Sequence, residues 1–232
     1  MKKIYKHLFF DLDHTLWDFD KNSELTLRQL YDEYDLGNKG VDDFSQFFSN
    51  YNVHNDKLWE RFRQGFIKRD ELRWKRMWLT LLDFKIGDTA LAHELSTAYL
   101  EILPTQSTLM PYAKEVLEHY KDKCVLHLIT NGFESTQWLK MQYSGISYYF
   151  NEVITSEKSN CLKPNREIFD YALRAAGALV ENSIMIGDAL EIDILGASNA
   201  GWDQVYYNPK KNVHTQSPTY EIHELNALMT II

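Results

Sequence analysis

Two carboxylates separated by one residue, Asp11 and Asp13, come directly after the apolar run at residues 8–10. The run predicts a buried strand, which places the pair at the carboxyl end of that strand. In an open parallel sheet, ligands gather at that edge of the sheet. Neighbouring carboxylates raise each other's pKa, and a divalent cation or a shared proton offsets the repulsion between them. Such a pair also occurs in turns and at helix N-caps, so other motifs have to distinguish a chemical role from a structural one.

Strand-like runs recur later in the chain and alternate with helical patterns. Short runs rich in apolar residues lie at residues 8–10, 125–129, 153–154, 183–186 and 205–207. Between the last four runs lie helical patterns at about 134–143, 166–176 and 192–200, and the last two stop at Gly177 and Gly201. The alternation predicts an α/β fold whose core is a doubly wound, mostly parallel, Rossmann-like sheet.

The region between the first two of these strands has helical periodicity and almost no strand-like runs. Apolar residues at helical spacing predict five helices, around residues 25–30, 44–48, 58–62, 72–82 and 91–103. Pro104 and Pro111 frame the return to the sheet, as expected where helices stop. We therefore expect an all-helical cap at residues 17–104, inserted into a catalytic core formed by residues 1–16 and 105–232.

The charge balance limits the partners that the chain can bind. With 25 Lys and Arg against 33 Asp and Glu, the formal net charge is −8, which disfavours nucleic acid polymers and anionic membranes. The first apolar run is too short for a signal peptide, and no segment approaches the roughly 18 apolar residues of a membrane span. We expect a cytoplasmic protein, monomeric or weakly homo-oligomeric, with a small-molecule substrate. Cys124 and Cys161 lie far apart and are expected to be core thiols.

A polar segment, Thr130-Asn131-Gly132, follows the second predicted strand. It offers a hydroxyl, an amide and a glycine N–H at the start of a helix, which together can hold phosphate oxygens. The same sequence is also common in ordinary turns. Lys163-Pro164 precedes the helix at 166–176, and a lysine beside a helix N-terminus opposes the macrodipole and calls for an anionic partner.

The fourth predicted strand is followed by another pair of carboxylates. Asp188 comes directly after Gly187, and Asp193 lies five residues further on. Either Asp188 or Asp193 could cap the next helix, but capping accounts for only one of the two.

Together and in this order, the segments resemble the four motifs of the haloacid dehalogenase-like hydrolase superfamily. These are Asp11-x-Asp13-x-Thr15, then Thr130, then Lys163-Pro164, and finally Gly187-Asp188 with Asp193. The resemblance covers the whole chain, because the helical region corresponds to the cap that follows the first motif. Within the superfamily, residues 11–20 (DLDHTLWDFD) are most similar to the branch of pyrimidine nucleoside monophosphate 5′-nucleotidases.

The resemblance implies catalysis through an aspartyl-phosphate. Asp11 would be the nucleophile that attacks phosphorus. Asp13 would protonate the leaving alcohol and then act as the base for water. Lys163 would neutralise the charge that Asp11 shares with the phosphoryl oxygens. The residues expected to bind the substrate phosphate are Thr130, Asn131, Gly132 and Lys163, with Thr130 hydrogen-bonded to the transferring group.

The resemblance also implies Mg²⁺ as the cofactor. Asp188 would bind the ion together with Asp11 and the backbone carbonyl of Asp13, which are hard oxygen ligands suited to Mg²⁺. Asp193 would lie outside the ligands and orient Lys163 or a metal-bound water. His14 stands where glycine is frequent in the superfamily, and we expect it to be a turn residue with an unusual backbone angle rather than a catalytic imidazole.

Asp13 separates the reaction classes of the superfamily. Members that cleave carbon–halogen bonds lack an acid/base Asp at this position, because a halide leaves without a proton. The chain is therefore expected to be a Mg²⁺-dependent phosphomonoester hydrolase, most similar to a 5′-nucleotidase for (deoxy)pyrimidine nucleoside monophosphates. A phosphatase or phosphomutase for a small sugar phosphate or phosphoglycolate stays open, as does a non-enzymatic binding protein. An Asp-x-Asp nucleotide-sugar transferase would explain neither Lys163 nor residues 187–193.

The predicted cap carries a cluster of basic residues at positions 57–76, which we call the basic island. Its members are Lys57, Arg61, Arg63, Lys68, Arg69, Arg73, Lys75 and Arg76. They could attract an anionic substrate, or they could form the solvated face of amphipathic helices. The aromatic residues Trp17, Trp59, Phe62, Trp74 and Trp78 could likewise stack on a base or pack in the core of the cap.

Overall fold

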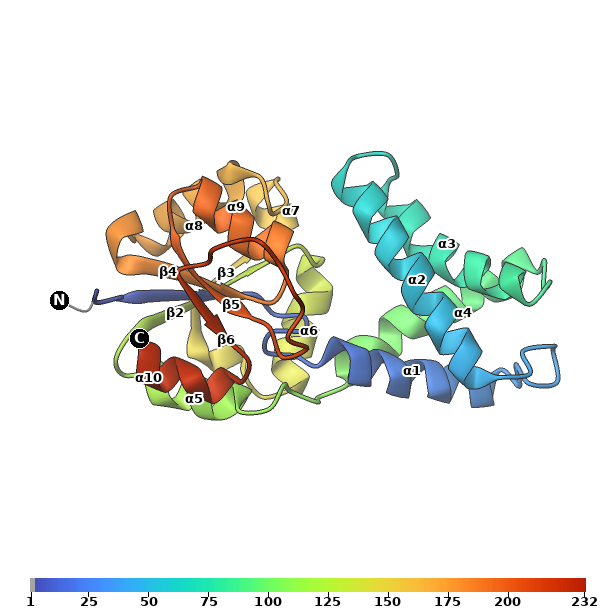
Figure 1. The fold of residues 1–232 in the computed structure, drawn as a ribbon. Coiled ribbons are helices and arrows are strands. Elements are labelled where there is room, and N and C mark those ends of the chain that lie inside the picture. Colours follow the sequence, from blue (N-terminus) through green and yellow to red (C-terminus); the bar gives the residue numbers. More distant parts are fainter. Residues whose placement is uncertain (1–2) are drawn as a thin grey trace. The chain divides into compact units, whose positions relative to one another are not determined.

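The computed structural model describes residues 3–232, and the chain divides into two compact units (Figure 1). One unit, called the core here, is Met1–Phe19 with Ser107–Ile232. The other, called the cap, is Asp20–Gln106. The cap expected at residues 17–104 begins and ends slightly before this second unit. Among residues 3–232, no helix is both long enough and apolar enough to cross a lipid bilayer.

The core is built on a six-stranded sheet in the order β3-β2-β1-β4-β5-β6, and its described strand pairs are all parallel. The strands are β1 (His7–Phe10), β2 (Val125–Thr130), β3 (Phe150–Thr155), β4 (Ser183–Gly187), β5 (Asp203–Tyr207) and β6 (Tyr220–Ile222). Because β1 lies between β2 and β4, the carboxyl ends of these three strands lie side by side where the strand order reverses. That position is where ligands bind in doubly wound sheets.

The doubly wound α/β fold predicted from the sequence is confirmed, with one addition. The strands β1 to β5 each contain one of the predicted runs. The sixth strand, β6, was not predicted, because it is only three residues long and holds Glu221 at its centre. Its pairing with β5 supplies the order that its own sequence does not signal.

Helices cover both faces of the sheet (Figure 1). On one face lie α8 (Arg166–Ala176) and α9 (Leu195–Asn199), and on the other lie α5 (Ala113–Tyr120) and α10 (Leu228–Ile231). The other helical segments of the core are α6 (Glu134–Tyr143), α7 (Ser156–Ser159), the π-turn η4 (Leu190–Ile194) and the 3₁₀ turns η2 (Ser147–Tyr149), η3 (Val180–Asn182) and η5 (Leu225–Ala227). The bounds of α6 and α8 are those predicted from the sequence, and Gly177 ends α8 in a left-handed conformation.

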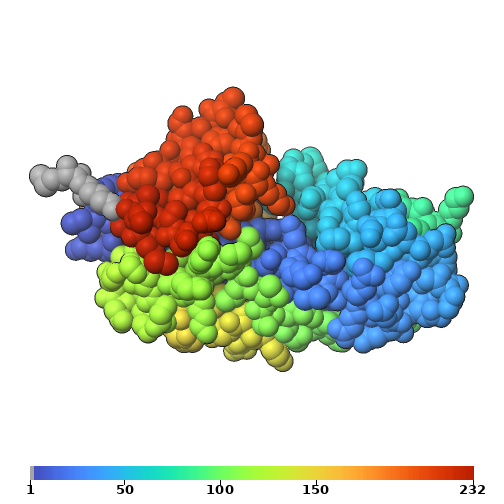
Figure 2. Space-filling model, turned by 60° about the horizontal axis from the view of Figure 1, so that its bottom comes forward, coloured from blue at the N-terminus to red at the C-terminus, as the bar shows by residue number. Residues whose placement is uncertain are grey.

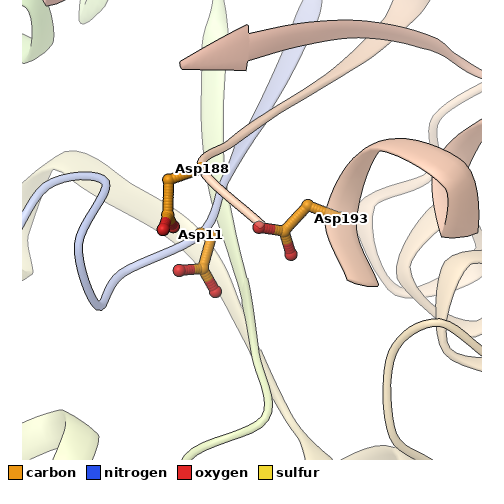
Figure 3. Close-up of side chains that lie close together, drawn as sticks. All are labelled: Asp11, Asp188 and Asp193. Atoms are coloured by element: carbon orange, nitrogen blue, oxygen red, sulfur yellow. The ribbon is translucent and has the colours of Figure 1, made fainter. Parts of the chain in front are cut away.

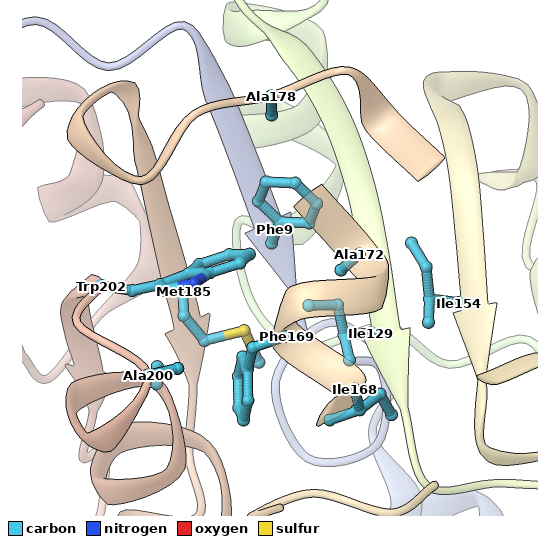
Figure 4. Packing of buried hydrophobic residues seen from close by; sticks show 11 residues of the cluster. Phe9, Ile129, Ile154, Ile168, Phe169, Ala172, Ala178, Met185, Ala200 and Trp202 are labelled. Carbon is cyan, nitrogen blue, oxygen red and sulfur yellow. The ribbon is translucent and has the colours of Figure 1, made fainter. Parts of the chain in front are cut away.

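Buried apolar side chains, among them three aromatic ones, fill the layer between the sheet and α8 and α9 (Figure 4). Trp202 lies edge-on against Phe9 of β1, with ring centroids 4.8 Å apart, and against Phe169 of α8 at 5.6 Å. All three side chains are almost fully buried. Since burial of one large apolar side chain contributes about 1.5–3 kcal/mol, this layer holds the central strands and α8 in a fixed relation.

The C-terminal helix α10 packs beside α5, although the two are about a hundred positions apart (Figure 2). Tyr120 of α5 donates a hydrogen bond of 2.8 Å from its hydroxyl to the carbonyl oxygen of Leu228. Both side chains are buried. The last residues of the chain therefore close the second face of the sheet.

The cap consists of long helices: α1 (Phe19–Glu33), α2 (Phe44–Arg63), α3 (Arg69–Asp83) and α4 (Thr89–Ile102), followed by the 3₁₀ turn η1 (Leu103–Thr105). Two of the five predicted helices, near 44–48 and 58–62, are one continuous helix, α2. No glycine or proline lies between them to interrupt it. Asp43 and Asp88 cap α2 and α4, where their carboxylates accept hydrogen bonds from Ser45 N–H and Leu91 N–H.

Candidate active site at the carboxyl end of the sheet

Lys163 is a buried cation held between two carboxylates. Its ammonium donates to Oδ1 of Asp11 and, at 2.8 Å, to the carbonyl oxygen of Ile129, and it lies 2.7 Å from Oδ1 of Asp193. Asp11 directly follows β1, and its N–H donates to the carbonyl oxygen of Ile186 on the neighbouring strand β4. Lys163 is only 1% exposed, so these oxygens replace the water that would otherwise solvate its charge. The anionic partner expected for Lys163 is therefore present twice.

The pKa values of Asp11 and Lys163 are both raised, although burial and charge oppose each other in each group. Burial raises the pKa of Asp11 to about 7, against the opposing effect of Lys163 and with a further contribution from Asp193. Burial alone would lower the pKa of Lys163, but the charges of Asp11 and Asp193 outweigh it and raise that pKa. Lys163 thus stays charged, and the carboxyl groups around it outnumber its single positive charge.

Three carboxyl groups, those of Asp11, Asp188 and Asp193, point toward one another (Figure 3). Each offers one oxygen within 4.8 Å of those of the other two. Burial raises the pKa of Asp188 well above its ordinary value, and the neighbouring Asp193 and Asp11 raise it further. Thr15 donates a 3.0 Å hydrogen bond to Oδ1 of Asp188. Hard oxygen donors with excess negative charge suit a cation such as Mg²⁺, so the residues present fit that ion.

Asp193 differs from the other two because both of its oxygens are engaged. Oδ1 lies against the ammonium of Lys163, and Oδ2 accepts the N–H of Ala189 at 3.1 Å. Gly187, at the end of β4, leaves room for this arrangement, since a Cβ there would lie 2.4 Å from Oδ2 of Asp193. Asp193 therefore braces Lys163, and Asp11 and Asp188 are better placed to offer oxygen to a cation.

Thr130, the last residue of β2, is buried with its hydroxyl oxygen in a hydrogen-bond network. The oxygen accepts the amide of Gln137 at 2.6 Å and the N–H of Gly132 at 3.1 Å. A hydroxyl that accepts twice still has its own proton to donate. Gly132 makes the network possible, because a Cβ at that position would lie 2.4 Å from the side chain of Gln137.

Asn131, which the sequence suggested as a phosphate ligand, has its side chain occupied elsewhere. Its amide donates to the carbonyl oxygen of Lys163 at 2.9 Å, and its Oδ1 accepts the N–H of Lys163 at 2.7 Å. This pair of hydrogen bonds ties the end of β2 to the segment that carries Lys163, whose peptide bond to Pro164 is cis. Asn131 therefore fixes the backbone of Lys163, and its own backbone N–H remains as the group that could reach a phosphate.

Asp13 has two partners that the sequence did not suggest, both on helix α6. Lys140 lies 2.6 Å from Oδ1 of Asp13, and Gln137 donates to Oδ2 at 3.0 Å. Burial would raise the pKa of Asp13, but the Lys140 ammonium and the Gln137 amide outweigh it and hold the pKa below its usual value. The available signal was their spacing, since residues three apart share a helix face, but nothing local indicates that this face turns toward Asp13.

His14 lies in the tight turn after Asp13 with a φ of 63°, which is in the left-handed region. The prediction of a turn residue with an unusual backbone angle is confirmed. Its N–H donates to the carbonyl oxygen of Trp17 at 2.8 Å, which closes the turn.

The basic island is partly occupied by contacts within the cap. Arg76 is buried, donates to Oδ1 of Asn55 at 3.0 Å and lies 5.0 Å from the ring centroid of Tyr99. Two partly buried members form ion pairs along their own helices, Arg63 with Glu60 and Lys75 with Glu71. Among the aromatic residues, Trp59 packs on Phe62 and Trp74 on Trp78, whereas Trp17 belongs to the core. These contacts favour a structural role for the residues concerned.

Comparison with known proteins gives a consistent assignment. A family model described as haloacid dehalogenase-like hydrolase matches residues 5–201. The chain is 34% identical to the pyrimidine 5′-nucleotidase PynA of Streptococcus pneumoniae, over 97% of this chain and 94% of the relative. It is 30% identical to the pyrimidine 5′-nucleotidase YjjG of Escherichia coli, over 97% and 96% of the two chains. The crystal structure of the magnesium-bound HAD-hydrolase YfnB of Bacillus subtilis matches with a TM-score of 0.89 and 30% identity, covering 99% of each chain.

Proposed function

Since this chain belongs to the family of haloacid dehalogenase-like hydrolases, we propose that it is a Mg²⁺-dependent phosphatase that cleaves phosphomonoesters through an aspartyl-phosphate on Asp11. The observation that carries the proposal is the pairing of Asp11 with a buried, charged Lys163 while Asp13, two residues away, is bound by separate partners. A nucleophile and an acid/base group are thus held in one tight turn at the edge of the sheet where ligands bind.

The first half of the reaction transfers the phosphoryl group to the enzyme. A carboxylate oxygen of Asp11 attacks phosphorus, and the bond from phosphorus to the leaving oxygen breaks while Asp13, which must be protonated in the complex with substrate, gives its proton to that oxygen. Lys163 offsets the negative charge on the phosphoryl oxygens. The hydroxyl of Thr130 donates a hydrogen bond to one of these oxygens, since its oxygen already accepts from Gln137 and Gly132.

The second half returns the enzyme to its starting state. Asp13, now a carboxylate, takes a proton from water as the water oxygen attacks phosphorus. The bond between phosphorus and Asp11 breaks, and inorganic phosphate leaves. Asp13 therefore alternates between acid and base, and one proton passes from water to the alcohol product over the cycle.

Asp11, Asp188 and the backbone carbonyl of Asp13 would hold Mg²⁺, which when bound supplies positive charge against the carboxylates and the phosphoryl oxygens. Asp193 contributes by fixing Lys163 from the other side. This division follows from the engagement of both Asp193 oxygens.

For the substrate we propose (deoxy)pyrimidine nucleoside monophosphates. The support comes from PynA and YjjG, two relatives named pyrimidine 5′-nucleotidases that align with this chain over nearly its full length and theirs. Residues 11–20 are also similar to the nucleotidase branch. The direct test is release of inorganic phosphate from thymidine or deoxyuridine monophosphate by the purified protein, with Mg²⁺ and with EDTA. Release that requires Mg²⁺ supports the proposal, and absence of release from any phosphomonoester would favour a non-enzymatic binding protein on this fold.

A further inference from the structure

Two side chains on one face of helix α6 contact the carboxyl group of Asp13. Lys140 contacts one oxygen at 2.6 Å and Gln137 donates to the other at 3.0 Å. Gln137 and Lys140 are three residues apart and therefore lie on the same face of the helix. With both oxygens engaged from one side, the carboxyl plane of Asp13 cannot rotate freely.

Lys140 is an unusual residue to bury in this place. Its side chain is 4% exposed, whereas that of Asp13 is 26% exposed, so a ligand can reach the carboxyl group but hardly the ammonium. The ammonium lies 4.4 Å from the ring centroid of Trp17 and 5.5 Å from that of Phe19. Two aromatic rings and one carboxylate thus enclose the cation. Removing a charge from water is costly, and an apolar side chain would fill the same space without that cost.

The side chain of Gln137 donates two hydrogen bonds at the site, but its own carbonyl oxygen accepts none within residues 3–232. Its amide nitrogen uses both protons, one on Asp13 and one on Thr130. Its Oε1 is buried and has no hydrogen-bond partner within residues 3–232. An unsatisfied buried acceptor destabilises a fold, so the position of this side chain is not explained by stability alone.

We propose that Lys140 and Gln137 are positioning residues that aim the carboxyl group of Asp13 at the leaving oxygen of the substrate. Gln137 holds Oδ2 of Asp13 at a fixed place relative to Thr130. Lys140 holds Oδ1 from a buried position that substrate does not reach. In the bond-breaking step, the proton moves from Asp13 to the leaving oxygen and Asp13 becomes a carboxylate facing the Lys140 ammonium. The inference rests on the acid role of Asp13 in the proposed function.

Leaving groups provide a readout that a merely structural role would not affect. The leaving alcohol of a nucleoside monophosphate needs a proton as it departs. The leaving group of p-nitrophenyl phosphate is a stable anion and needs none. The ratio kcat/KM reports the steps up to departure of the leaving group, so loss of proton donation lowers it for the nucleotide and spares the aryl phosphate.

The test compares Lys140→Met, Gln137→Met and Asp13→Asn on these two substrates, with Mg²⁺ present. Methionine has an unbranched side chain of similar length, but it lacks the charge of lysine and the amide of glutamine. We expect Lys140→Met to lower kcat/KM for the nucleotide by about a hundredfold and for p-nitrophenyl phosphate by less than about threefold, the scale of lost acid catalysis. Gln137→Met should show the same selectivity to a smaller degree. Gln142→Met, at an exposed position of α6, is the matched control and should change neither value.

The outcomes separate this inference from the proposed function. If Asp13→Asn is selective for the nucleotide and neither methionine variant at positions 137 or 140 is, the positioning role is wrong and the acid role stands. Equal losses on both substrates, or a rise in KM alone, would also overturn it. If Asp13→Asn itself affects both substrates equally, the acid role and the inference fail together. Circular dichroism of each variant identifies unfolding, and the Gln137 variant carries the test should Lys140→Met not fold.

Discussion

The ammonium of Lys163 lies 2.7 Å from Oδ1 of Asp193, thirty positions along the chain, while the other oxygen of Asp193 is fixed by the N–H of Ala189. Asp193 thereby ties Lys163 to the turn after β4. The same ammonium contacts Asp11 after β1 and the end of β2 through Ile129. One cation thus joins three neighbouring strands at their carboxyl ends. A change to Asp11 or Asp193 should therefore affect the site more than the fold.

Gly187→Ala tests the contact between Asp193 and Lys163 without changing either residue. The new Cβ would lie 2.4 Å from Oδ2 of Asp193, so Asp193 has to move away and its support of Lys163 weakens. We expect a large fall in kcat with little change in KM, together with about 1–3 kcal/mol of lost stability, the usual cost of overpacking. Steady-state kinetics and urea unfolding measure the two effects. Gly87→Ala, where a Cβ meets nothing within 4 Å, serves as the control. Full activity in the Gly187 variant would contradict the bracing role of Asp193.

Asp11→Asn should abolish turnover while the protein stays folded. The substitution removes the proposed nucleophile but keeps the shape of the side chain, and Asp193 still pairs with Lys163. Phosphate release measures activity and a thermal melt measures folding. Asp42→Asn, on an exposed residue of the cap, should leave both unchanged. Activity within about tenfold of the unmodified protein would mean that the activation free energy rises by only about 1.4 kcal/mol, and it would exclude Asp11 as the nucleophile.

Mg²⁺ should raise the thermal stability of the protein. A ligand that binds only the folded state stabilises it by about 2.7 kcal/mol at a hundred times its Kd. The melting temperature is measured with EDTA and then with increasing Mg²⁺, for the unmodified chain and for Asp188→Asn. The shift should be much smaller in the variant, which lacks one carboxylate of the triad. An equal shift in both proteins would place the ion elsewhere.

The metal-free protein should lose stability as the pH rises from about 4 to about 7. The pKa of Asp11 is raised from 3.8 to about 7 by burial, so in this range the folded chain keeps a proton that the unfolded chain has released. Folding then takes up a proton, and raising the pH disfavours it. Urea unfolding in EDTA at a series of pH values should therefore show a steeper decline for the unmodified chain than for Asp11→Asn. Parallel curves for the two proteins would mean that Asp11 has an ordinary pKa.

A panel of phosphomonoesters should give the highest kcat/KM for pyrimidine nucleoside monophosphates. Deoxy forms should be accepted, and di- and triphosphates should be rejected. In the proposed mechanism the core contacts the phosphate of every substrate in the same way, so discrimination depends on what lies beyond the phosphate. If phosphoglycolate or a hexose phosphate exceeded every nucleotide by about a hundredfold, roughly 2.7 kcal/mol of transition-state preference, the nucleotidase proposal would be wrong. A phosphatase for a small phosphate ester would then replace it.

The sequence by itself determined the fold class and the identity of most residues around the site. Asp11, Thr130 and Asp188 each end or follow a short apolar run, and parallel pairing of those runs brings their carboxyl ends to one edge of the sheet. Local pattern is enough to show where each run ends, and in a parallel sheet those ends lie at the same edge. The catalytic roles of these residues remain predictions.

Only the tertiary structure decided which side chains contact which. Asn131 binds the backbone of Lys163, and Lys140 of α6 faces Asp13 across more than a hundred positions of sequence. Helical spacing could group Gln137 with Lys140 but could not show where that face points. The rotation of α6, the side-chain rotamers and the space left by Gly132 are set by packing between distant segments, and no local sequence pattern encodes them.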